Sequence, residues 1–350
     1  MTKYFSEDLQ GVSPYVAGEQ PQDKSYIKLN TNESPFPPSA GAVEAAARQA
    51  ERLNLYSDPT CGPLKQAAAE FYGLKPENIL CGNGSDEVLY FIFRAFCSKN
   101  KGMACPDVSY GFYPVLCGLL NIPYIPVPLK ADFTVYPPDY AKIIGNVCIA
   151  NPNAQTGVYL NLNGVEKILR RHPDDVVVLD EAYIDFGGQS ALSLLKSYKN
   201  LIVVQTMSKS RSLAGGRVGF AFADAEIISD LDAVRNSFNP YNINRMSMFA
   251  AAESLKDVSY FRSCVDKIIE TREYTVMELE GLGFEVLPSS ANFVLAKTEK
   301  ICGETLYLKL KERGILVRHL TDDRIKDYVR ITIGGRGQME KLISELKNLL

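Results

Sequence analysis

Short, fully apolar runs separated by helical stretches are the feature that most restricts the fold of this chain. Apolar strands that alternate with helices are typical of a mostly parallel sheet covered by helices on both faces. The segments at 86–97 and 164–172 have helical composition. The sequence therefore predicts an α/β fold. The apolar runs occupy residues 78–82, 102–106, 124–129, 146–151, 176–180, 201–206 and 218–223.

The two ends of the chain differ from this central part. Residues 1–38 are rich in Pro, Asn and Ser and predict an irregular arm. Long helical stretches around 244–281 precede four alternating strand-like segments, which indicates a smaller α+β domain. With 350 residues, of which 46% are hydrophobic, the chain can bury a core of this size. We expect a large domain at 39–240 and a small domain at 241–350.

Composition excludes several functional classes. The net charge is -3 and the basic residues are scattered, so nucleic-acid binding is not expected. The first residues are too polar for a signal peptide, and no apolar run approaches the roughly 20 residues that span a bilayer. Eight cysteines without a CxxC pair fit reduced thiols in the cytoplasm. Only His172 and His319 are present, which disfavours a metal site or a Ser-His-Asp triad.

Ligands of parallel α/β sheets bind at the carboxyl ends of the strands, so the residues that follow each apolar run are candidates for a site. The first such end is the turn at 81–87, which contains Gly84, Ser85 and Asp86 and opens a helix. Free backbone N–H groups and the positive end of the helix dipole can bind a phosphate there. An ordinary helix N-cap has the same residues, and both readings stay open.

The second strand end places Asp180 at the tip of a buried strand, with Tyr183 three residues later. A carboxylate is costly to bury without a cation, and the protonated pyridine nitrogen of pyridoxal 5'-phosphate (PLP) is one suitable partner. A carboxylate that caps a turn is the alternative.

The third strand end carries Lys209, followed eight residues later by Arg217. A lysine that is partly desolvated near cations loses its proton readily and can bond to an aldehyde. The guanidinium of an arginine suits a phosphate. A fourth end, the amide-rich turn at 151–157, can offer a donor to a ligand or can be an ordinary turn.

The order of these features along the chain is phosphate turn, amide turn, acid, lysine and arginine. That order resembles the PLP-dependent aminotransferases of fold type I, over nearly the whole chain. Within that family the sequence is most similar to the histidinol-phosphate aminotransferases. The resemblance implies a large domain with a mostly parallel seven-stranded sheet, a smaller α+β domain and an N-terminal arm. The similar segments are PYVAGEQP, KLNTNESPFPPS, LYSDPTCGPLKQAAAEFYG, GNGSDE, DEAYIDF, TMSKSRSLAGGRVGF and VRITIGG.

The resemblance also implies catalytic roles. Lys209 would carry PLP and then move a proton between the substrate and the cofactor. Asp180 would keep the pyridine nitrogen protonated, and Tyr183 would donate to the ring oxygen O3'. Tyr56 would reach the cofactor phosphate of a neighbouring subunit, which makes the active unit a homodimer. The remaining implied cofactor contacts are Gly84, Ser85, Asp86, Tyr110, Asn153, Thr206, Ser208 and Arg217.

For the substrate, the resemblance assigns Arg330 to the carboxylate of a keto acid or the phosphate of a phosphorylated amine. Arg318, Tyr15 and Asn292 would complete that site. Two guanidinium groups suit a dianionic phosphate. The implied reaction is transamination between L-histidinol phosphate and 2-oxoglutarate in histidine biosynthesis. Threonine-phosphate decarboxylase and aromatic amino-acid aminotransferase are alternatives on the same fold.

The sequence departs from the family at the amide turn. The family has Asn-Pro-Thr-Gly, whereas this chain has Ala154-Gln155-Thr156-Gly157. Asn153, one place earlier, would supply the amide contact to O3' if the turn is re-registered.

Overall fold

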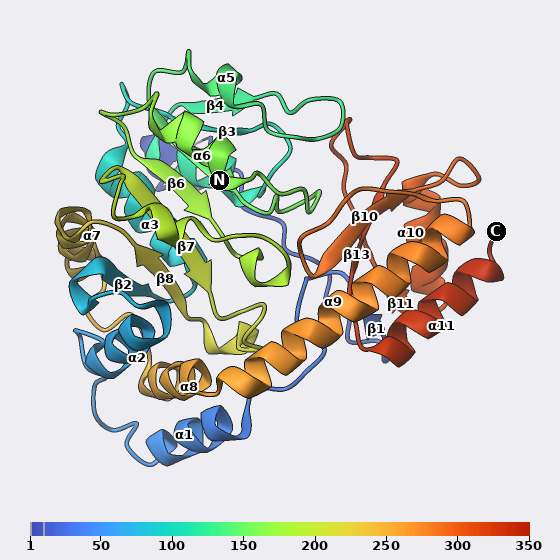
Figure 1. Cartoon of the computed structure of the whole chain (residues 1–350), viewed down its shortest axis with the longest axis horizontal. Helices are drawn as coiled ribbons and strands as arrows, with labels where there is room; N and C mark the ends of the chain where they lie inside the picture. Colours follow the sequence, from blue (N-terminus) through green and yellow to red (C-terminus); the bar gives the residue numbers. More distant parts are fainter. Residues whose placement is uncertain (1, 10) are drawn as a thin grey trace.

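The computed structural model describes residues 2–9 and 11–350, and a seven-stranded sheet lies at its centre (Figure 1). The strand order is β2-β8-β7-β6-β5-β3-β4. Strand β8 pairs antiparallel with β2 and β7, and the other pairings are parallel. The predicted mostly parallel sheet is therefore confirmed. The strands are β2 (Ile79–Gly82), β3 (Met103–Pro106), β4 (Tyr124–Val127), β5 (Asn146–Ala150), β6 (Val177–Asp180), β7 (Leu201–Thr206) and β8 (Gly219–Phe222).

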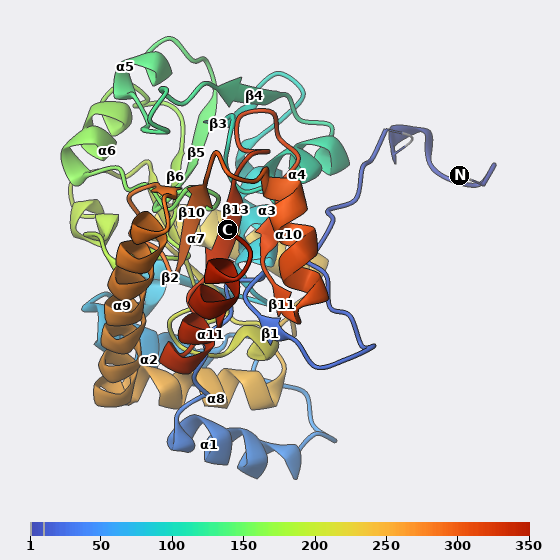
Figure 2. The same ribbon diagram turned by 90° about the vertical axis from the view of Figure 1, so that its right-hand side faces the viewer.

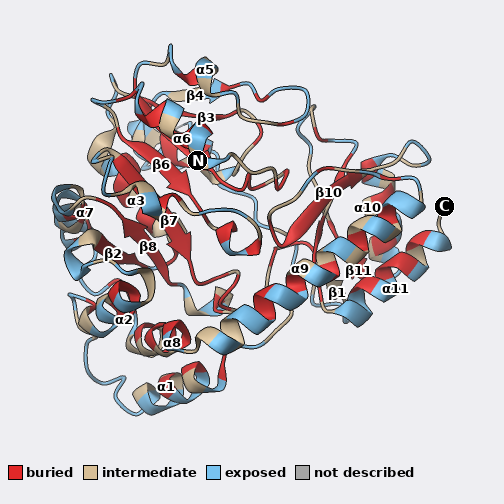
Figure 3. Ribbon diagram, in the orientation of Figure 1, coloured by how far each residue is buried: buried red, intermediate tan, exposed pale blue. Residues whose placement is uncertain are grey.

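Helices cover both faces of this sheet. Along β6, Val178 packs into one core, while Val177 and Leu179 pack into the other. This alternation explains why the strands are apolar throughout and almost fully buried (Figure 3). The helices of this part are α1 (Ala40–Ala50), which packs on α8, and α2 (Gly62–Tyr72), α3 (Ser85–Phe96), α4 (Phe112–Leu120), α5 (Pro137–Tyr140), α6 (Leu162–Leu169), α7 (Ala225–Phe238) and α8 (Arg245–Lys256).

A second, antiparallel sheet has the order β12-β13-β10-β9 and packs against three helices. The arm joins this body, because β1 (Ile27–Lys28) pairs in parallel with β11 (Ile315–Leu316). Figure 2 shows the earlier part of the arm extending away from the rest. The remaining elements are β9 (Glu285–Val286), β10 (Phe293–Lys297), β12 (Arg318–His319), β13 (Val329–Thr332), α9 (Val258–Gly281), α10 (Gly303–Glu312) and α11 (Arg336–Lys347).

The exact division into domains, at 38/39 and 240/241, stays a prediction. Helix α8 bears on it, because Met248, Ala251 and Leu255 pack in the same core as strands of the seven-stranded sheet. We therefore propose a later boundary, at Asp257 between α8 and α9. Among the described residues, no helix combines the length and the apolar character needed to cross a membrane.

Candidate active site

A cavity of about 220 Å³ lies at the carboxyl ends of β5, β6 and β7, beside the N-terminus of α3. Parallel strands that end at one edge of a sheet bring their following residues together, which is why residues distant in sequence meet here. Residues of the arm and of β13 complete the cavity wall. The residues predicted from the sequence that line it are Tyr15, Ser85, Asp86, Tyr110, Asp180, Tyr183, Thr206, Ser208, Lys209, Arg217, Arg318 and Arg330.

One end of the cavity is suited to an anion. Helix α3 begins after Gly84, which has a φ of 85° and provides no side-chain cap, so the first N–H groups of the helix remain available. A Cβ on Gly84 would lie 2.5 Å from Nη2 of Arg217, so only glycine leaves room for that guanidinium. Asp86 Oδ2 lies 3.3 Å from the same nitrogen and holds the arginine in place. The hydroxyls of Thr206 and Ser208 line the same cavity.

Asp180 offers a negative charge at the tip of β6. Its Oδ2 accepts a hydrogen bond from the Tyr113 hydroxyl at 2.8 Å, while its buried Oδ1 has no partner within the described protein. The pKa of Asp180 is raised from 3.8 to about 6, mainly by burial; the hydrogen bond from Tyr113 opposes this change and the charge of Asp86 adds to it. An unpartnered buried carboxylate oxygen fits a cofactor that has a protonated ring nitrogen.

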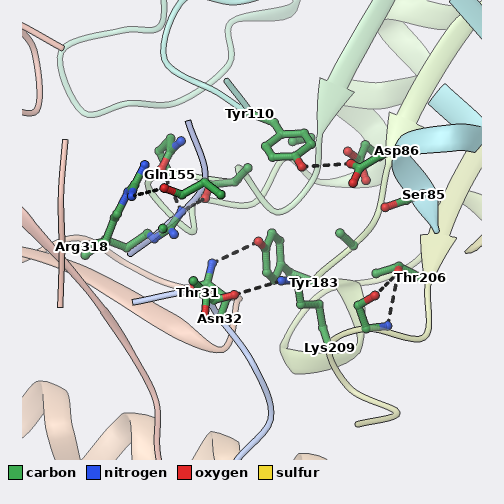
Figure 4. Close-up of a pocket in the computed structure, with 18 of the residues that line it drawn as sticks. Thr31, Asn32, Ser85, Asp86, Tyr110, Gln155, Tyr183, Thr206, Lys209 and Arg318 are labelled. Atoms are coloured by element: carbon green, nitrogen blue, oxygen red, sulfur yellow. Dashed lines mark hydrogen bonds between the residues drawn. The ribbon is translucent and has the colours of Figure 1, made fainter. Parts of the chain in front are cut away.

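Lys209 and Tyr183 lie next to each other on the cavity wall (Figure 4). Lys209 Nζ lies 5.7 Å from the centroid of the Tyr183 ring and donates to the Thr31 carbonyl at 3.3 Å. Tyr110 donates from its hydroxyl to Asp86 at 2.9 Å, and burial raises the pKa of Tyr110, which keeps that hydroxyl protonated. The Lys209 amine therefore lies in the same cavity as the aromatic rings of Tyr183 and Tyr110, where it could reach a bound aromatic ring.

Two arginines form the opposite end of the cavity, and both donate to neutral groups. Arg330 Nη1 donates to the Ala154 carbonyl at 3.0 Å and to Gln155 Oε1 at 2.9 Å, while its buried Nε has no partner in the described protein. Arg318 donates to backbone carbonyls of the arm at 3.1 and 3.3 Å. Among the ion pairs of the described residues, neither guanidinium has a carboxylate partner.

The environment of this pair affects the pKa of Arg330 itself and that of Tyr15 beside it. Burial lowers the pKa of Arg330, because the charged form is desolvated. Burial raises the pKa of Tyr15, and the two guanidinium charges oppose that change. A pair of partly buried guanidinium groups with neutral partners is an anion-binding arrangement.

Four predicted residues do not line the cavity: Gly84, which directly precedes α3, and Asn153, Asn292 and Tyr56. The Asn153 amide donates to the Val108 carbonyl at 2.8 Å, and its Oδ1 accepts from two backbone N–H groups of its own turn. Both polar atoms of the Asn153 side chain thus have partners within the protein, and its contact to O3' stays a prediction. Asn292 is buried behind the cavity and donates to the Asn32 carbonyl at 3.0 Å. Tyr56 is 79% exposed and stacks on Tyr241 with ring centroids 4.6 Å apart.

The sequence reasoning missed several residues that reach the site. Asn30 and Thr31 provide carbonyl acceptors for Arg330 and Lys209, and Asn32 bonds to Tyr183. These three residues lie within KLNTNES, a segment whose similarity to the family was the available signal. Nothing in the local sequence indicated Tyr113 as the partner of Asp180.

Known proteins resemble this chain over nearly its whole length. The family model for aminotransferase class I and II matches residues 24–346. A histidinol-phosphate aminotransferase of Clostridium botulinum (strain Kyoto / Type A2) is 45% identical over 100% of this chain and 99% of its own length. A histidinol-phosphate aminotransferase of Marinomonas sp. (strain MWYL1) is 48% identical over 100% of this chain and 100% of its own length.

Solved structures share the fold. The histidinol-phosphate aminotransferase of Clostridium acetobutylicum has a TM-score of 0.86 and 25% identity, over 92% of this chain and 98% of that one. The histidinol-phosphate aminotransferase of Sinorhizobium meliloti was solved in complex with pyridoxal-5'-phosphate. It has a TM-score of 0.91 and 24% identity, over 100% of this chain and 99% of that one. By its fold and by its full-length similarity to these enzymes, the chain belongs to the aminotransferase class I and II family.

Proposed function

We propose that this protein is a PLP-dependent aminotransferase that moves the amino group of L-histidinol phosphate to 2-oxoglutarate, in the cytoplasm and as a step of histidine biosynthesis. The full-length relatives named for this reaction support the proposal. The structural observation that carries it is the pairing of Arg330 and Arg318 at one end of the cavity with only neutral partners. Such a pair can bind the phosphate of one substrate and a carboxylate of the other in turn.

PLP, when bound, supplies an aldehyde that takes up the substrate amine and a ring that accepts the electrons left at Cα. The N-terminus of α3, Ser208 and Arg217 would hold its phosphate. Asp180 would hold the protonated ring nitrogen, and Tyr183 would donate to the ring oxygen.

Lys209 has two tasks in this proposal. Its Nζ would hold the cofactor, and as a free amine it would take the proton from the substrate Cα and deliver it to C4' of the cofactor. The hydrogen bond from Nζ to the Thr31 carbonyl holds the amine at the cavity wall when it is free. Residues of the arm and of β13 form walls of the cavity, and limited access of water there would favour transfer over loss of the proton to solvent.

We further propose that two copies of the chain form the active homodimer, with Tyr56 of each reaching the cofactor phosphate of the other. The ring of Tyr56 is 79% exposed, and the exposed Leu53 and Leu55 precede it. An apolar cluster of this kind is typical of a surface that a second subunit covers. Arg245 donates to the Tyr56 carbonyl and fixes the position of this segment.

A half-reaction experiment tests the proposed substrate. Enzyme loaded with PLP is mixed with histidinol phosphate, and the absorbance of the cofactor is followed in a single turnover. We expect conversion to the pyridoxamine form, with histidinol lacking the phosphate reacting far more slowly. Faster conversion with an aromatic amino acid would contradict the proposal, and release of carbon dioxide from threonine phosphate would select the decarboxylase.

Variants test whether the arginines at this end of the cavity bind the phosphate of the substrate. Arg318→Ala should weaken the apparent affinity for histidinol phosphate by about tenfold or more, because charged hydrogen bonds are lost. Arg170→Ala removes an exposed arginine on a helix of the outer layer and is the matched control. Equal behaviour of both variants would show that the phosphate binds elsewhere.

A further inference from the structure

The hydrogen bonds around Asn32 fix the direction of a proton at the centre of the site. The backbone N–H of Asn32 donates to Thr332 Oγ1 at 3.0 Å. A backbone N–H can only donate, so the Thr332 oxygen accepts this bond and its own proton is free to point elsewhere. That proton is donated to Asn32 Oδ1, which lies 2.9 Å away.

The orientation of the Asn32 amide follows from this bond. Its oxygen faces the Thr332 hydroxyl, so its nitrogen faces the other way and lies 3.0 Å from Oη of Tyr183. An amide nitrogen only donates, and therefore the Tyr183 oxygen accepts. The proton of the Tyr183 hydroxyl cannot point at Asn32, and within the described chain its oxygen has no other hydrogen-bond partner. The O–H group is thus directed into the cavity that Tyr183 lines (Figure 4).

Asn32 is held firmly enough to perform this role. Its side chain is 1% exposed, and its carbonyl accepts from Asn292 Nδ2 at 3.0 Å. Its φ of 55° lies in the left-handed region, which asparagine tolerates better than most residues. Thr332 Oγ1 on β13 bonds to both the backbone N–H and the amide oxygen of Asn32, and Asn292, directly before β10, bonds to its carbonyl. The amide therefore has little freedom to turn.

The direction of the Tyr183 proton matters more in this chain because no neighbouring amide shares the task. Ala154 lines the cavity with a methyl group, and the Asn153 side chain donates to the Val108 carbonyl and accepts from its own turn. The charged and titratable groups that face Tyr183 are Lys209 from the loop after β7, Arg330 from β13, Tyr15 from the arm and Tyr110 from the turn before α4.

We infer that Asn32 is a positioning residue, which together with Thr332 aims the Tyr183 hydroxyl at the ring oxygen of the bound cofactor. This inference rests on the proposed function, since it concerns the same cofactor. Asn32 itself touches neither substrate nor reacting atoms in this account. It acts through Tyr183.

Replacing the donor by an acceptor tests the inference. In Asn32→Asp a carboxylate faces the Tyr183 hydroxyl, which then donates to the carboxylate and turns away from the cofactor. The ring oxygen loses a hydrogen bond to its negative form, so the bound chromophore should hold its proton more tightly. We expect its titration midpoint, followed by absorbance, to rise by about one pH unit, and cofactor binding to weaken about tenfold.

A double-variant cycle separates positioning from a merely structural role. Tyr183→Phe should shift the chromophore in the same direction, and Asn32→Asp added to Tyr183→Phe should cause no further shift. Additive shifts would overturn the inference, as would an unshifted chromophore in Asn32→Asp. Thermal unfolding of each variant shows any loss of stability separately from the spectrum.

Thr332 gives a second route that leaves Asn32 in place. Thr332→Val keeps the shape but removes the hydroxyl that orients the amide, so a smaller shift of the same sign is expected. Thr332→Ser keeps the hydroxyl and should retain the original midpoint. A wild-type chain that takes up no PLP would overturn the proposed function and this inference together. An active, cofactor-bearing wild type with unshifted Asn32→Asp and Thr332→Val variants would overturn the inference alone.

Discussion

Replacing Asp180 by asparagine should stabilise the cofactor-free protein at high pH while it weakens cofactor binding. Asp180 is 4% exposed, and its Oδ1 has no partner among the described residues. Burial raises its pKa from 3.8 to about 6. Since one unit of pKa corresponds to about 1.4 kcal/mol, keeping this carboxylate ionised costs the folded state about 3 kcal/mol.

The sign of the pH dependence follows from the raised pKa. Between pH 3.8 and about 6 the folded protein retains a proton on Asp180 that the unfolded chain has lost. The stabilisation by this group is therefore complete below the lower value and disappears as the pH rises through the upper one. Asparagine does not titrate, so the stability of Asp180→Asn relative to wild type should increase by about 3 kcal/mol between roughly pH 4 and pH 8.

Urea unfolding of the two cofactor-free proteins at both pH values measures this difference, and groups common to both cancel. Glu181→Gln is the matched control, because burial also raises the pKa of Glu181, to about 7, while Ser190 and Gln205 bind its carboxylate outside the cavity lining. Both variants should show the pH-dependent gain, but only Asp180→Asn should weaken PLP binding. A stability difference between Asp180→Asn and wild type that is the same at both pH values would refute the reasoning.

Three further outcomes are expected. Gln155→Glu places a carboxylate against Arg330, so KM for histidinol phosphate should rise about tenfold or more while the cofactor spectrum stays unchanged; an unaltered KM would contradict the role of Arg330. Lys209→Ala should abolish borohydride fixation of the cofactor and lower kcat by about a hundredfold or more, as single-turnover kinetics would measure. Tyr56→Phe should raise the dissociation constant for PLP about tenfold without changing the sedimentation coefficient, whereas an unchanged constant would count against the crossed contact.

Much of the fold could be predicted because its signals are local. The apolar runs at 146–151, 176–180 and 201–206 became β5, β6 and β7, since a strand buried on both faces must be apolar throughout. Helix α2 ends before Gly73, which has a φ of 65°. Glycine adopts this left-handed conformation more readily than other residues, which explains why a glycine follows the helix. The antiparallel direction of β8 was not readable, because apolar composition does not encode the direction of a strand.

The sequence by itself determined which residue types follow each strand, and so it indicated Asp180, Lys209 and Arg217 as parts of one site. Only the tertiary structure decided how their neighbours are bonded. Asn32 contacts Tyr183 at a separation of 151 residues and Thr332 at 300. Asn153, which the local pattern favoured as a donor, instead bonds to its own turn and to Val108. Local patterns fix backbone conformation and burial, whereas the partner of a buried polar group depends on which segments the fold brings within hydrogen-bond distance.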